Sequence, residues 1–355
     1  MATTTAVILA ILIFSFLIFI HELGHFVAAK LSGVQVNEFS MFMGPALLKK
    51  KWGETQYTLR LIPLGGYCAM EGEDGDSENP RAFGNAKWWK RLIILVAGAA
   101  MNFLSGLVLL GLFYGPWPQF VVPQVEAVEP ESCMAGYLQP GDSLYKLDGE
   151  RIYDTSDFEL LLQLNPRDTH ELVVKRQGEK VTYSDLKIEK REITEENGNK
   201  ALRYGFNYSI REASVPALLD QIWRTAANTV RMVRLSLKML FTGQAGIKDL
   251  GGPVMIVDMM AQTANSSEDS YQALMSLVYF GAFLGINLAV MNLLPIPALD
   301  GGRVVCLIIT ETIQAFTHKK VDPKYEGYIN AGGMILLLGL MGIVMFKDIF
   351  VLFTR

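Results

Sequence analysis

The chain has 355 residues, of which 50% are hydrophobic and 19% are charged, and its net charge is −4 at pH 7. Its mean hydropathy of +0.25 weighs against an ordinary soluble enzyme and favours a protein embedded in a membrane. The nearly neutral balance gives no indication of nucleic-acid binding. The three cysteines are scattered and form no C-x-x-C pair, so we expect neither an intrachain disulfide nor a zinc knuckle.

Four apolar segments are long enough to cross about 30 Å of hydrocarbon at about 1.5 Å per residue. They are residues 6–29, 92–114, 272–294 and 328–346. The first segment follows no basic residue and contains no small-residue cleavage site, so we interpret it as a retained helix rather than a signal peptide. The sequence therefore predicts an α-helical polytopic membrane protein with four transmembrane helices.

The first apolar segment contains the pentapeptide His21-Glu22-Leu23-Gly24-His25. On a helix His21 and His25 lie one turn apart on the same face, with Glu22 about 60° away from His25. Two imidazoles suit zinc, and the adjacent carboxylate suits a general base toward water at the metal. A chance H-E-x-x-H match is the alternative, but ionisable groups inside a membrane cost about 3 kcal/mol each. That cost favours a functional metal site.

The distribution of Lys and Arg residues predicts the orientation of the chain in the membrane. The connection after the first span, residues 30–91, carries nine Lys and Arg residues, whereas the residues before the span carry none. The positive-inside rule places this connection in the cytoplasm. We therefore expect both termini, and the polar stretch between the second and third spans, to be extracytoplasmic.

The connection also holds a β-rich stretch, about residues 36–73. Residues 55–61 alternate polar and apolar side chains, and we expect Gly65 and Gly66 to turn the chain before a last strand over residues 67–70. A membrane-associated β-hairpin is tolerated only where its backbone is paired or lines a cavity. An unpaired edge beside the metal would hold a substrate backbone.

The polar stretch between the second and third spans is long enough for one small domain. We expect strands over residues 171–175 and 180–183, with turns at residues 177–178 and 197–198. Residues 135–144 and 147–152 resemble the A-G-L-x-x-G-D-x-I and D-G-x-x-I run of protease-associated PDZ domains. The resemblance implies an inserted PDZ-like α+β domain that binds a peptide or C-terminal tail by strand addition. A folded spacer that only blocks access is the alternative.

Residues 215–241 form an amphipathic helical pattern. Four basic residues fall within about 80° of one another, which is typical of an interfacial helix rather than a fifth span. They are Arg224, Arg231, Arg234 and Lys238.

A zinc enzyme of this kind needs a third protein ligand. The third span ends in Asn292-Leu293-Leu294-Pro295-Ile296-Pro297-Ala298-Leu299-Asp300-Gly301-Gly302, where the two prolines must break the helix. His170 falls in the outer domain and His318 in a basic loop, so Asp300 is the candidate ligand. The alternative is that Asp300 only caps a following helix, which we expect over residues 303–316.

With these motifs the chain resembles the site-2 protease family of intramembrane zinc metalloproteases, in particular the bacterial RseP/RasP type with a single PDZ domain. The resemblance spans essentially the whole chain. It rests on residues 21–25, on Pro63-Leu64-Gly65-Gly66-Tyr67, on the N-x-x-P-x-P-x-L-D-G run from Asn292 to Gly301, and on Gly251-Gly252-Pro253. The G-P-x-x-N element of the family reads here as residues 98–102, with Ala99 in place of the proline.

The resemblance implies a role for each group. His21, His25 and Asp300 would bind Zn²⁺, Glu22 would be the catalytic base, and the hairpin would meet the substrate as an added strand at Gly65, Gly66 and Tyr67. Asn102 or Asn292 would hold the oxyanion or the substrate strand. We expect four parts: a first membrane half (1–115), the PDZ-like domain (118–211), interfacial helices (215–265) and a second membrane half (272–355).

The predicted function is that of a zinc-dependent intramembrane endopeptidase. It would cut transmembrane segments of membrane proteins, such as anti-sigma factors or remnant signal peptides, in the plasma membrane of a bacterium. This reaction belongs to regulated intramembrane proteolysis. A catalytically silent PDZ adaptor is disfavoured because both histidines, Glu22 and Asp300 are present. A metal transporter is disfavoured because the sequence offers no second intramembrane acidic or histidine site.

Overall fold

The computed structural model describes residues 3–73, 75, 77–194, 200–246, 251–267, 269–318, 322 and 324–354. The chain divides into two compact units, residues 1–113 with 229–355, and residues 114–228. The first unit holds the apolar helices and a β-hairpin, and the second holds a β-sheet domain. The predicted fold class, a helical membrane protein with an inserted β domain, is confirmed.

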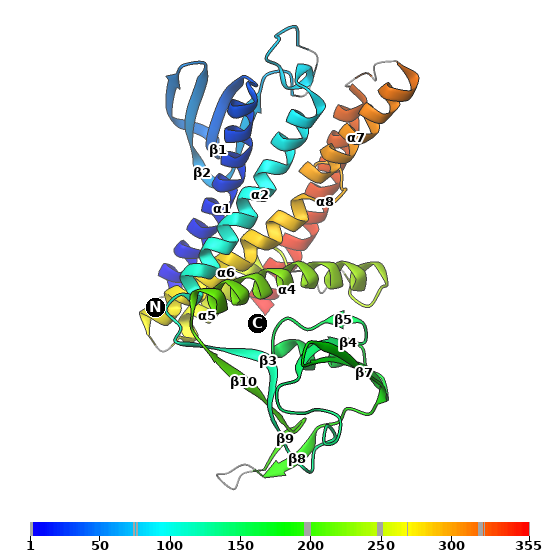
Figure 1. The fold of residues 1–355 in the computed structure, drawn as a ribbon. Helices are drawn as coiled ribbons and strands as arrows, with labels where there is room; N and C mark the ends of the chain where they lie inside the picture. The colour runs from blue at the N-terminus through cyan, green and yellow to red at the C-terminus, as the bar shows by residue number, and fades with distance from the viewer. Residues whose placement is uncertain are drawn as a thin grey trace. The chain divides into compact units, whose positions relative to one another are not determined.

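Four helices of the described residues are long and apolar enough to cross a membrane. They are α1 (Thr3–Ser32), α2 (Trp88–Tyr114), α6 (Ser270–Asn292) and α8 (Lys324–Thr354). Each coincides with one of the four predicted spans, and the chain is a multi-pass membrane protein. In Figure 1 they run from blue at α1 to red at α8. Ala99 is buried in α2, which continues through this position without a break.

The predicted hairpin is present as β1 (Val36–Trp52) and β2 (Thr55–Met70), which are antiparallel. The predicted turn before residues 67–70 is confirmed by the register. Met41 pairs with both Leu59 and Gly66, and Glu38 pairs with both Gln56 and Ala69, so the chain reverses within β2 between Leu59 and Gly66. Gly65, at this reversal, has a positive φ of 82°. Gly53, whose φ is 62°, makes the turn between β1 and β2.

The register shows that both strands fold back within the sheet. Residues 38–41 of β1 pair with residues 66–69 of β2 on one side and with residues 56–59 on the other. The second half of β1, residues 46–52, pairs with residues 55–60. The hairpin therefore has two outer edges, one formed by residues 66–70 and the other by residues 46–52.

The hairpin runs back along α1 toward the interior of its span (Figure 1). The hydroxyl of Ser15 donates a hydrogen bond of 2.7 Å to the carbonyl of Pro63, at the reversal within β2. Ser15 precedes Ser32, the end of the helix, by 17 residues, or about 25 Å of helix axis. The aromatic rings of Phe26 and Phe39 also meet, with centroids 4.9 Å apart. The reversal within β2 therefore lies deep alongside the first span.

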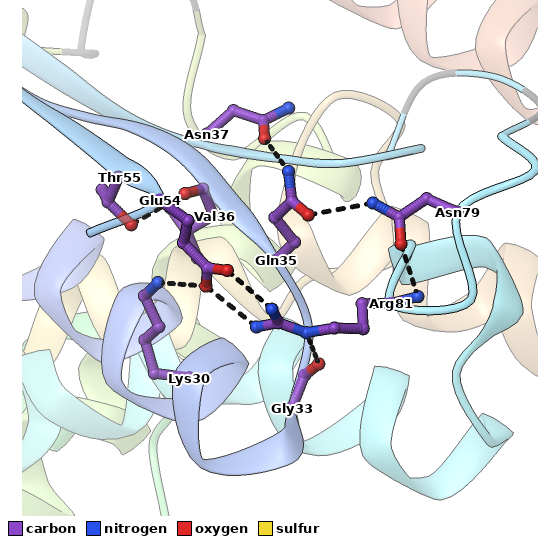
Figure 2. Close-up of polar contacts among 9 residues, drawn as sticks. All are labelled: Lys30, Gly33, Gln35, Val36, Asn37, Glu54, Thr55, Asn79 and Arg81. Atoms are coloured by element: carbon purple, nitrogen blue, oxygen red, sulfur yellow. Dashed lines mark hydrogen bonds and ion pairs between the residues drawn. The ribbon is translucent and has the colours of Figure 1, made fainter. Parts of the chain in front are cut away.

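The other end of the hairpin is tied to the end of α1 by polar contacts (Figure 2). The carboxylate of Glu54 accepts hydrogen bonds from Lys30 Nζ at 2.6 Å and from both terminal nitrogens of Arg81 at 2.6 and 2.8 Å. Arg81 Nε in turn donates to the carbonyl of Gly33. The hydrogen bonds from Arg81, and then that from Lys30, lower the pKa of Glu54 to about 2. Glu54 therefore fixes the turn as a carboxylate.

The first unit also contains helices beside the four apolar spans. Helix α5 (Pro253–Ser266) packs between α1 and α6, where Met260 and Ala261 join a cluster of buried residues with Leu17 and Leu277. Its N-terminus is capped from α8, because the carboxylate of Asp348 accepts hydrogen bonds from two backbone N–H groups of the first turn, at Gly252 and Met255.

The helix predicted over residues 303–316 is α7 (Asp300–Thr317), which begins three residues earlier than expected.

The second unit contains a six-stranded sheet with the order β10-β3-β4-β6-β7, and β5 beside β4. Its strands are β3 (Gln119–Val128), β4 (Ser143–Leu147), β5 (Glu150–Arg151), β6 (His170–Arg176), β7 (Glu179–Leu186) and β10 (Phe206–Glu212). Helix α3 (Ser156–Leu164) buries Phe158, and β8 (Arg191–Thr194) pairs with β9 (Lys200–Arg203). The predicted strands over 171–175 and 180–183 and the turn at 177–178 are confirmed; the turn at 197–198 lies outside the described residues.

The amphipathic helix predicted over residues 215–241 is α4 (Val215–Phe241), whose bounds agree with the prediction. Its interfacial position stays a prediction.

Candidate metal centre

Three side chains from the two ends of the chain converge on one point. His21 Nε2 and His25 Nε2 lie 3.2 and 3.3 Å from Asp300 Oδ2, and 3.2 Å from each other. The two histidines come from α1, inside the span Val7–Ser32, and Asp300 is the first residue of α7. Among the described residues this is the one group of three or more His, Cys, Asp and Glu side chains able to hold a metal ion.

The separations fit zinc. Nitrogen and oxygen ligands lie about 2.0–2.1 Å from Zn²⁺, so the edges of its coordination tetrahedron measure about 3.3 Å. All three measured separations are within 0.2 Å of that edge length. Asp300 Oδ2 is also a buried oxygen without a hydrogen-bond donor among the described residues. A cation bound by Asp300 Oδ2 and the two Nε2 atoms would satisfy that oxygen and both imidazoles.

The backbone of α2 orients one of the imidazoles. His25 Nδ1 lies 2.8 Å from the carbonyl of Ile94, which can only accept a hydrogen bond. Nδ1 is therefore the protonated nitrogen, and the lone pair of Nε2 is directed toward His21 and Asp300. The amide of Asn292, the last residue of α6, lies 3.4 Å from His21 Nδ1. Asn292 is thus in contact with the predicted ligand set.

A glycine of α2 makes room for both rings. A Cβ placed on Gly98 would collide with His25 Nε2 and would meet the His21 ring within 3 Å. Gly24, between the two histidines, similarly faces the carbonyl of Ala97. Helices α1 and α2 therefore approach closely enough for α2 to form the floor of the site. This cavity for the imidazoles depends on glycine at position 98.

The segment between α6 and α7, which contains Pro295 and Pro297, places Asp300 beside the two histidines. Helix α6 ends at Asn292, and the chain passes through Pro295 and Pro297 outside either helix before α7 begins. Gly301 and Gly302 face the backbone of residues 293–297 so closely that a Cβ would collide with it. The N-cap of α7 is Leu299, and no side chain caps the helix. The alternative role of Asp300 as a helix cap is therefore not the one that the structure shows.

The hairpin passes beside Glu22. A Cβ on Gly66 would lie 3.4 Å from Glu22 Cγ and 3.0 Å from the carbonyl of Ser40. The outer edge of residues 66–70 thus reaches the carboxylate that follows His21. Tyr67 is held by Arg60, whose guanidinium donates a hydrogen bond of 2.6 Å to its hydroxyl. Gly65 lies at the reversal within β2, in contact with the side chain of Met43.

Asn102 lies on the same face of α2 as Gly98, one turn further along the helix. It is 1% exposed, and its Oδ1 has no hydrogen-bond partner among the described residues. An unsatisfied buried amide oxygen is costly, so this group suits a ligand that brings its own donor.

A second link joins α7 to the hairpin. Arg303, one turn after Asp300, pairs with the carboxylate of Glu73, which also accepts a hydrogen bond from the backbone N–H of Met70 at the end of β2. This ion pair and the floor at Gly98 are the parts of the site that the sequence analysis missed. Neither belongs to a local motif, because each depends on how separate elements pack.

Comparison with known proteins identifies the family. The sequence model of peptidase family M50 matches residues 9–340. A Clostridium perfringens protein provisionally named a zinc metalloprotease is 38% identical over 349 residues, 97% of this chain and 98% of its own length. A similarly named protein of Clostridium acetobutylicum is 37% identical over 347 residues, 97% of each chain. The regulator of sigma-W protease RasP of Bacillus subtilis is 28% identical over 428 residues, 97% of this chain and 98% of its own. Because the family match and the first two relatives extend over nearly the whole chain, the chain belongs to peptidase family M50 and is a zinc metalloprotease.

Proposed function

We propose that the protein is an intramembrane endopeptidase that cuts the transmembrane segments of other membrane proteins. The observation that carries this proposal is that the two candidate histidine ligands and the candidate base lie inside a membrane span. His21, His25 and Glu22 lie within an apolar span, beside a paired strand edge that runs back along the same span. A protease acting on soluble chains has no need of a site at that depth.

His21, His25 and Asp300 are the proposed zinc ligands, and Glu22 is the proposed general base. Zinc bound there would act as a Lewis acid that acidifies water and polarises the scissile carbonyl. Glu22 takes a proton from the attacking water as the oxygen bonds to the carbonyl carbon. When the C–N bond breaks, Glu22 returns that proton to the leaving amine. Atoms and charge balance as one water is consumed for each peptide bond.

The substrate is proposed to add as a strand to residues 66–70, with Gly65, Gly66 and Tyr67 nearest the reacting bond. A helical substrate must unwind first, because its peptide groups are bonded within its own helix. The free backbone groups of the edge replace those bonds. Asn102 and Asn292 are the proposed donors to the oxyanion or to the substrate backbone. The contact of Asn292 with the His21 ring and the unsatisfied oxygen of Asn102 support these roles.

Membrane-anchored anti-sigma factors and remnant signal peptides are the proposed substrates. The name of the Bacillus subtilis relative, regulator of sigma-W protease, supports a substrate that controls a sigma factor. The excess of Lys and Arg in the connection between the first two spans supports a cytoplasmic hairpin, with both termini and residues 118–211 outside the plasma membrane of a bacterium. The inserted domain is proposed to be PDZ-like and to receive a peptide or C-terminal tail. The four-part division at 1–115, 118–211, 215–265 and 272–355 is part of the same proposal.

Glu22→Gln tests the proposal together with Asp300→Ala. Each variant is co-expressed with an anti-sigma-factor reporter or a signal-peptide reporter, and zinc content is measured on the purified protein. Glu22→Gln should keep zinc and lose cleavage, because an amide cannot accept the proton. Asp300→Ala should lose both.

The matched control is Asp258→Asn. It removes the negative charge of a carboxylate in α5 that is not part of the group formed by His21, His25 and Asp300, so it should change neither zinc content nor cleavage. Cleavage near the wild-type rate by Glu22→Gln would overturn the assignment of the base. Equal zinc content in Asp300→Ala and wild type would overturn the ligand set.

A further inference from the structure

The outer edge of the hairpin that lies away from Glu22 has an unusual surface. Residues 46–52 form this edge, and Leu47, Leu48 and Trp52 are 56%, 66% and 78% exposed. Between them stand Lys49, Lys50 and Lys51, all exposed. An exposed strand edge that mixes large apolar side chains with ammonium groups is a contact surface for a partner of the same mixed character.

The three lysines are not neutralised within the hairpin. Its acidic residues are Glu38 and Glu54. Glu38 pairs with Arg60 at 2.9 Å, and Glu54 is held by Lys30 and Arg81 (Figure 2). Within the described residues Lys49, Lys50 and Lys51 take part in no ion pair. Three positive charges therefore remain available on one short strand.

The anchored turn sets the depth of the edge. Trp52 adjoins the turn that Glu54 fixes to Lys30, near the end of the span Val7–Ser32. From Trp52 the strand descends about 3.3 Å per residue, first through the lysines and then through Leu48 and Leu47. Met43, Leu61 and Ile62, further down the hairpin, are 49%, 57% and 45% exposed. Tryptophan and lysine give way to exposed aliphatic residues, as in a surface that crosses from headgroups into hydrocarbon.

The start of the next span marks the same boundary. Trp88 and Trp89 open α2, are 54% and 43% exposed, and are flanked by Lys87 and Lys90. Because α1 and α2 are consecutive spans, the end of one and the start of the other lie at the same face of the membrane. Exposed tryptophan and lysine side chains thus mark this face of the membrane both at the hairpin edge and at the start of α2.

We propose that residues 46–52 bind the headgroups of anionic phospholipids in the leaflet that meets the hairpin. Lys49, Lys50 and Lys51 contact the phosphate groups, and Leu47, Leu48 and Trp52 enter the boundary of the acyl chains. The hairpin then has two edges with different partners: the edge at Gly66 for the substrate strand, and the edge at Lys50 for lipid. Charge complementarity selects an anionic lipid, and the exposed aliphatic residues select a membrane over an acidic protein segment or a nucleic acid.

The test uses the full-length protein in nanodiscs of phosphatidylcholine and phosphatidylglycerol. The chain has five tryptophans, so the signal of Trp52 is taken as the difference between wild type and Trp52→Phe. Bromine is placed on the acyl chains of one lipid at a time, while the lipid composition is kept constant. At equal mole fraction, brominated phosphatidylglycerol should quench Trp52 more strongly than brominated phosphatidylcholine.

The variant Lys49→Gln/Lys50→Gln/Lys51→Gln should lose this preference, and Lys49→Arg/Lys50→Arg/Lys51→Arg should keep it. Each lysine near an anionic surface favours contact by about fivefold. The ratio of quenching by brominated phosphatidylglycerol to quenching by brominated phosphatidylcholine should therefore fall to about one in the glutamine variant.

Equal quenching by the two lipids in wild type, or no quenching by either, would overturn the proposal. A glutamine variant with the wild-type preference would do the same. If the glutamine variant cleaves a reporter more slowly by the same factor in phosphatidylcholine alone and in the mixture, the edge contacts substrate and not lipid. The fluorescence readout needs no cleavage, so the proposal and the proteolytic function fail separately.

Discussion

At the scale of single residues, the floor beneath the two imidazoles is the part of the site most sensitive to a small change. Gly98→Ala puts a methyl group where His25 Nε2 and the His21 ring lie. The two imidazole rings must shift, and their Nε2 atoms then move away from each other and from Asp300 Oδ2. We expect zinc affinity to fall at least tenfold, as when an orienting neighbour of a metal ligand is lost, and cleavage to fall with it. Competition with a zinc chelator measures the affinity.

The control for this change is Gly339→Ala, in the spanning helix α8, where a Cβ would meet nothing within 4 Å. It should leave zinc affinity unchanged. Wild-type zinc affinity in Gly98→Ala would show that the imidazoles do not depend on this floor.

The carboxylate of Glu54 predicts a pH dependence for the anchored turn. Its pKa is lowered to about 2 in the fold, from an ordinary value near 4.5. A lowered pKa means that the anchor is fully present above about pH 4.5 and is lost as the pH falls toward 2. A spin label on Trp52→Cys should therefore become more mobile over that interval. With Glu54→Gln added, the label should already be mobile at pH 7 and should vary little with acid.

Glu78→Gln serves as the control, since this exposed carboxylate of the same connection takes part in no ion pair among the described residues. Label mobility in Glu54→Gln equal to that in Glu78→Gln would show that the turn is held by other contacts.

Some of the site residues could be predicted from local sequence motifs, and others could not. His21, Glu22 and His25 form a motif whose spacing alone predicts a shared helix face, and Asp300 follows two prolines that must end a helix. The structure brings the two histidines and Asp300 together, as that analysis predicts. Gly98 has no such signature, because a glycine in an apolar helix reveals its role only when the rotation of α2 against α1 is known. Glu73 and Arg303 are 230 residues apart, so their pairing also needs the packed fold.

At the scale of elements, the two edges of the hairpin should respond differently to proline. Tyr67→Pro or Cys68→Pro removes an N–H and restricts φ on the edge beside Glu22, so cleavage of a transmembrane reporter should fall at least tenfold. Lys50→Pro makes the same change on the opposite edge and should leave cleavage near the wild-type rate. Cys68→Ala separates the loss of the thiol from the loss of the N–H. All variants should retain zinc.

Membrane-inserted variants of matched abundance give the comparison. If Lys50→Pro reduces cleavage as much as Tyr67→Pro, the hairpin responds as a whole and the substrate edge is not distinguished.

The cap supplied by α8 predicts a stability change in α5. Asp348→Ala leaves the N–H groups of Gly252 and Met255 without their acceptor. The loss should lower the free energy of unfolding by about 0.5–2 kcal/mol, as for other helix caps, whereas Asp348→Asn retains an acceptor and should lose less. Thermal unfolding in detergent measures the difference. Equal loss in both variants would point to the packing of the side chain rather than to the cap.

The elements themselves were predictable where length and hydropathy dominate. Each of the four spans coincides with an apolar segment, because hydrocarbon demands a continuous apolar helix. The reversal at Gly65 and Gly66 was predicted from the glycine pair, whereas the pairing of residues 38–41 with both arms of β2 shows only in the strand register. The start of α7 at Asp300 depends on the close approach of Gly301 and Gly302 to the preceding loop, a tertiary contact with no local signal.

At the scale of the whole molecule, the second unit is an insertion whose two ends meet. The strands that enter and leave it, β3 and β10, pair directly, with Gln119 opposite Glu212 and Phe120 opposite Arg211. A short linker can therefore replace residues 122–208. If the domain filters substrates, the deletion protein should keep zinc and should cleave a substrate that has not been trimmed outside the membrane. Zinc content and the two cleavage assays are measured on the same preparation.

The full-length protein is the reference, since it should cut only the trimmed substrate. A folded, zinc-loaded deletion protein that still rejects the untrimmed substrate would show that the insertion is not the filter.

The distance along the chain between the donors affects when the enzyme can become active. His25 and Asp300 are separated by 275 residues, although they lie 3.3 Å apart in the fold. At about 5–20 residues per second, a ribosome needs tens of seconds to pass from one to the other. Throughout that time the nascent chain carries an incomplete donor set in its first inserted helix. With the proposed ligand set, proteolytic activity therefore arises only when synthesis and insertion of the protein are nearly complete.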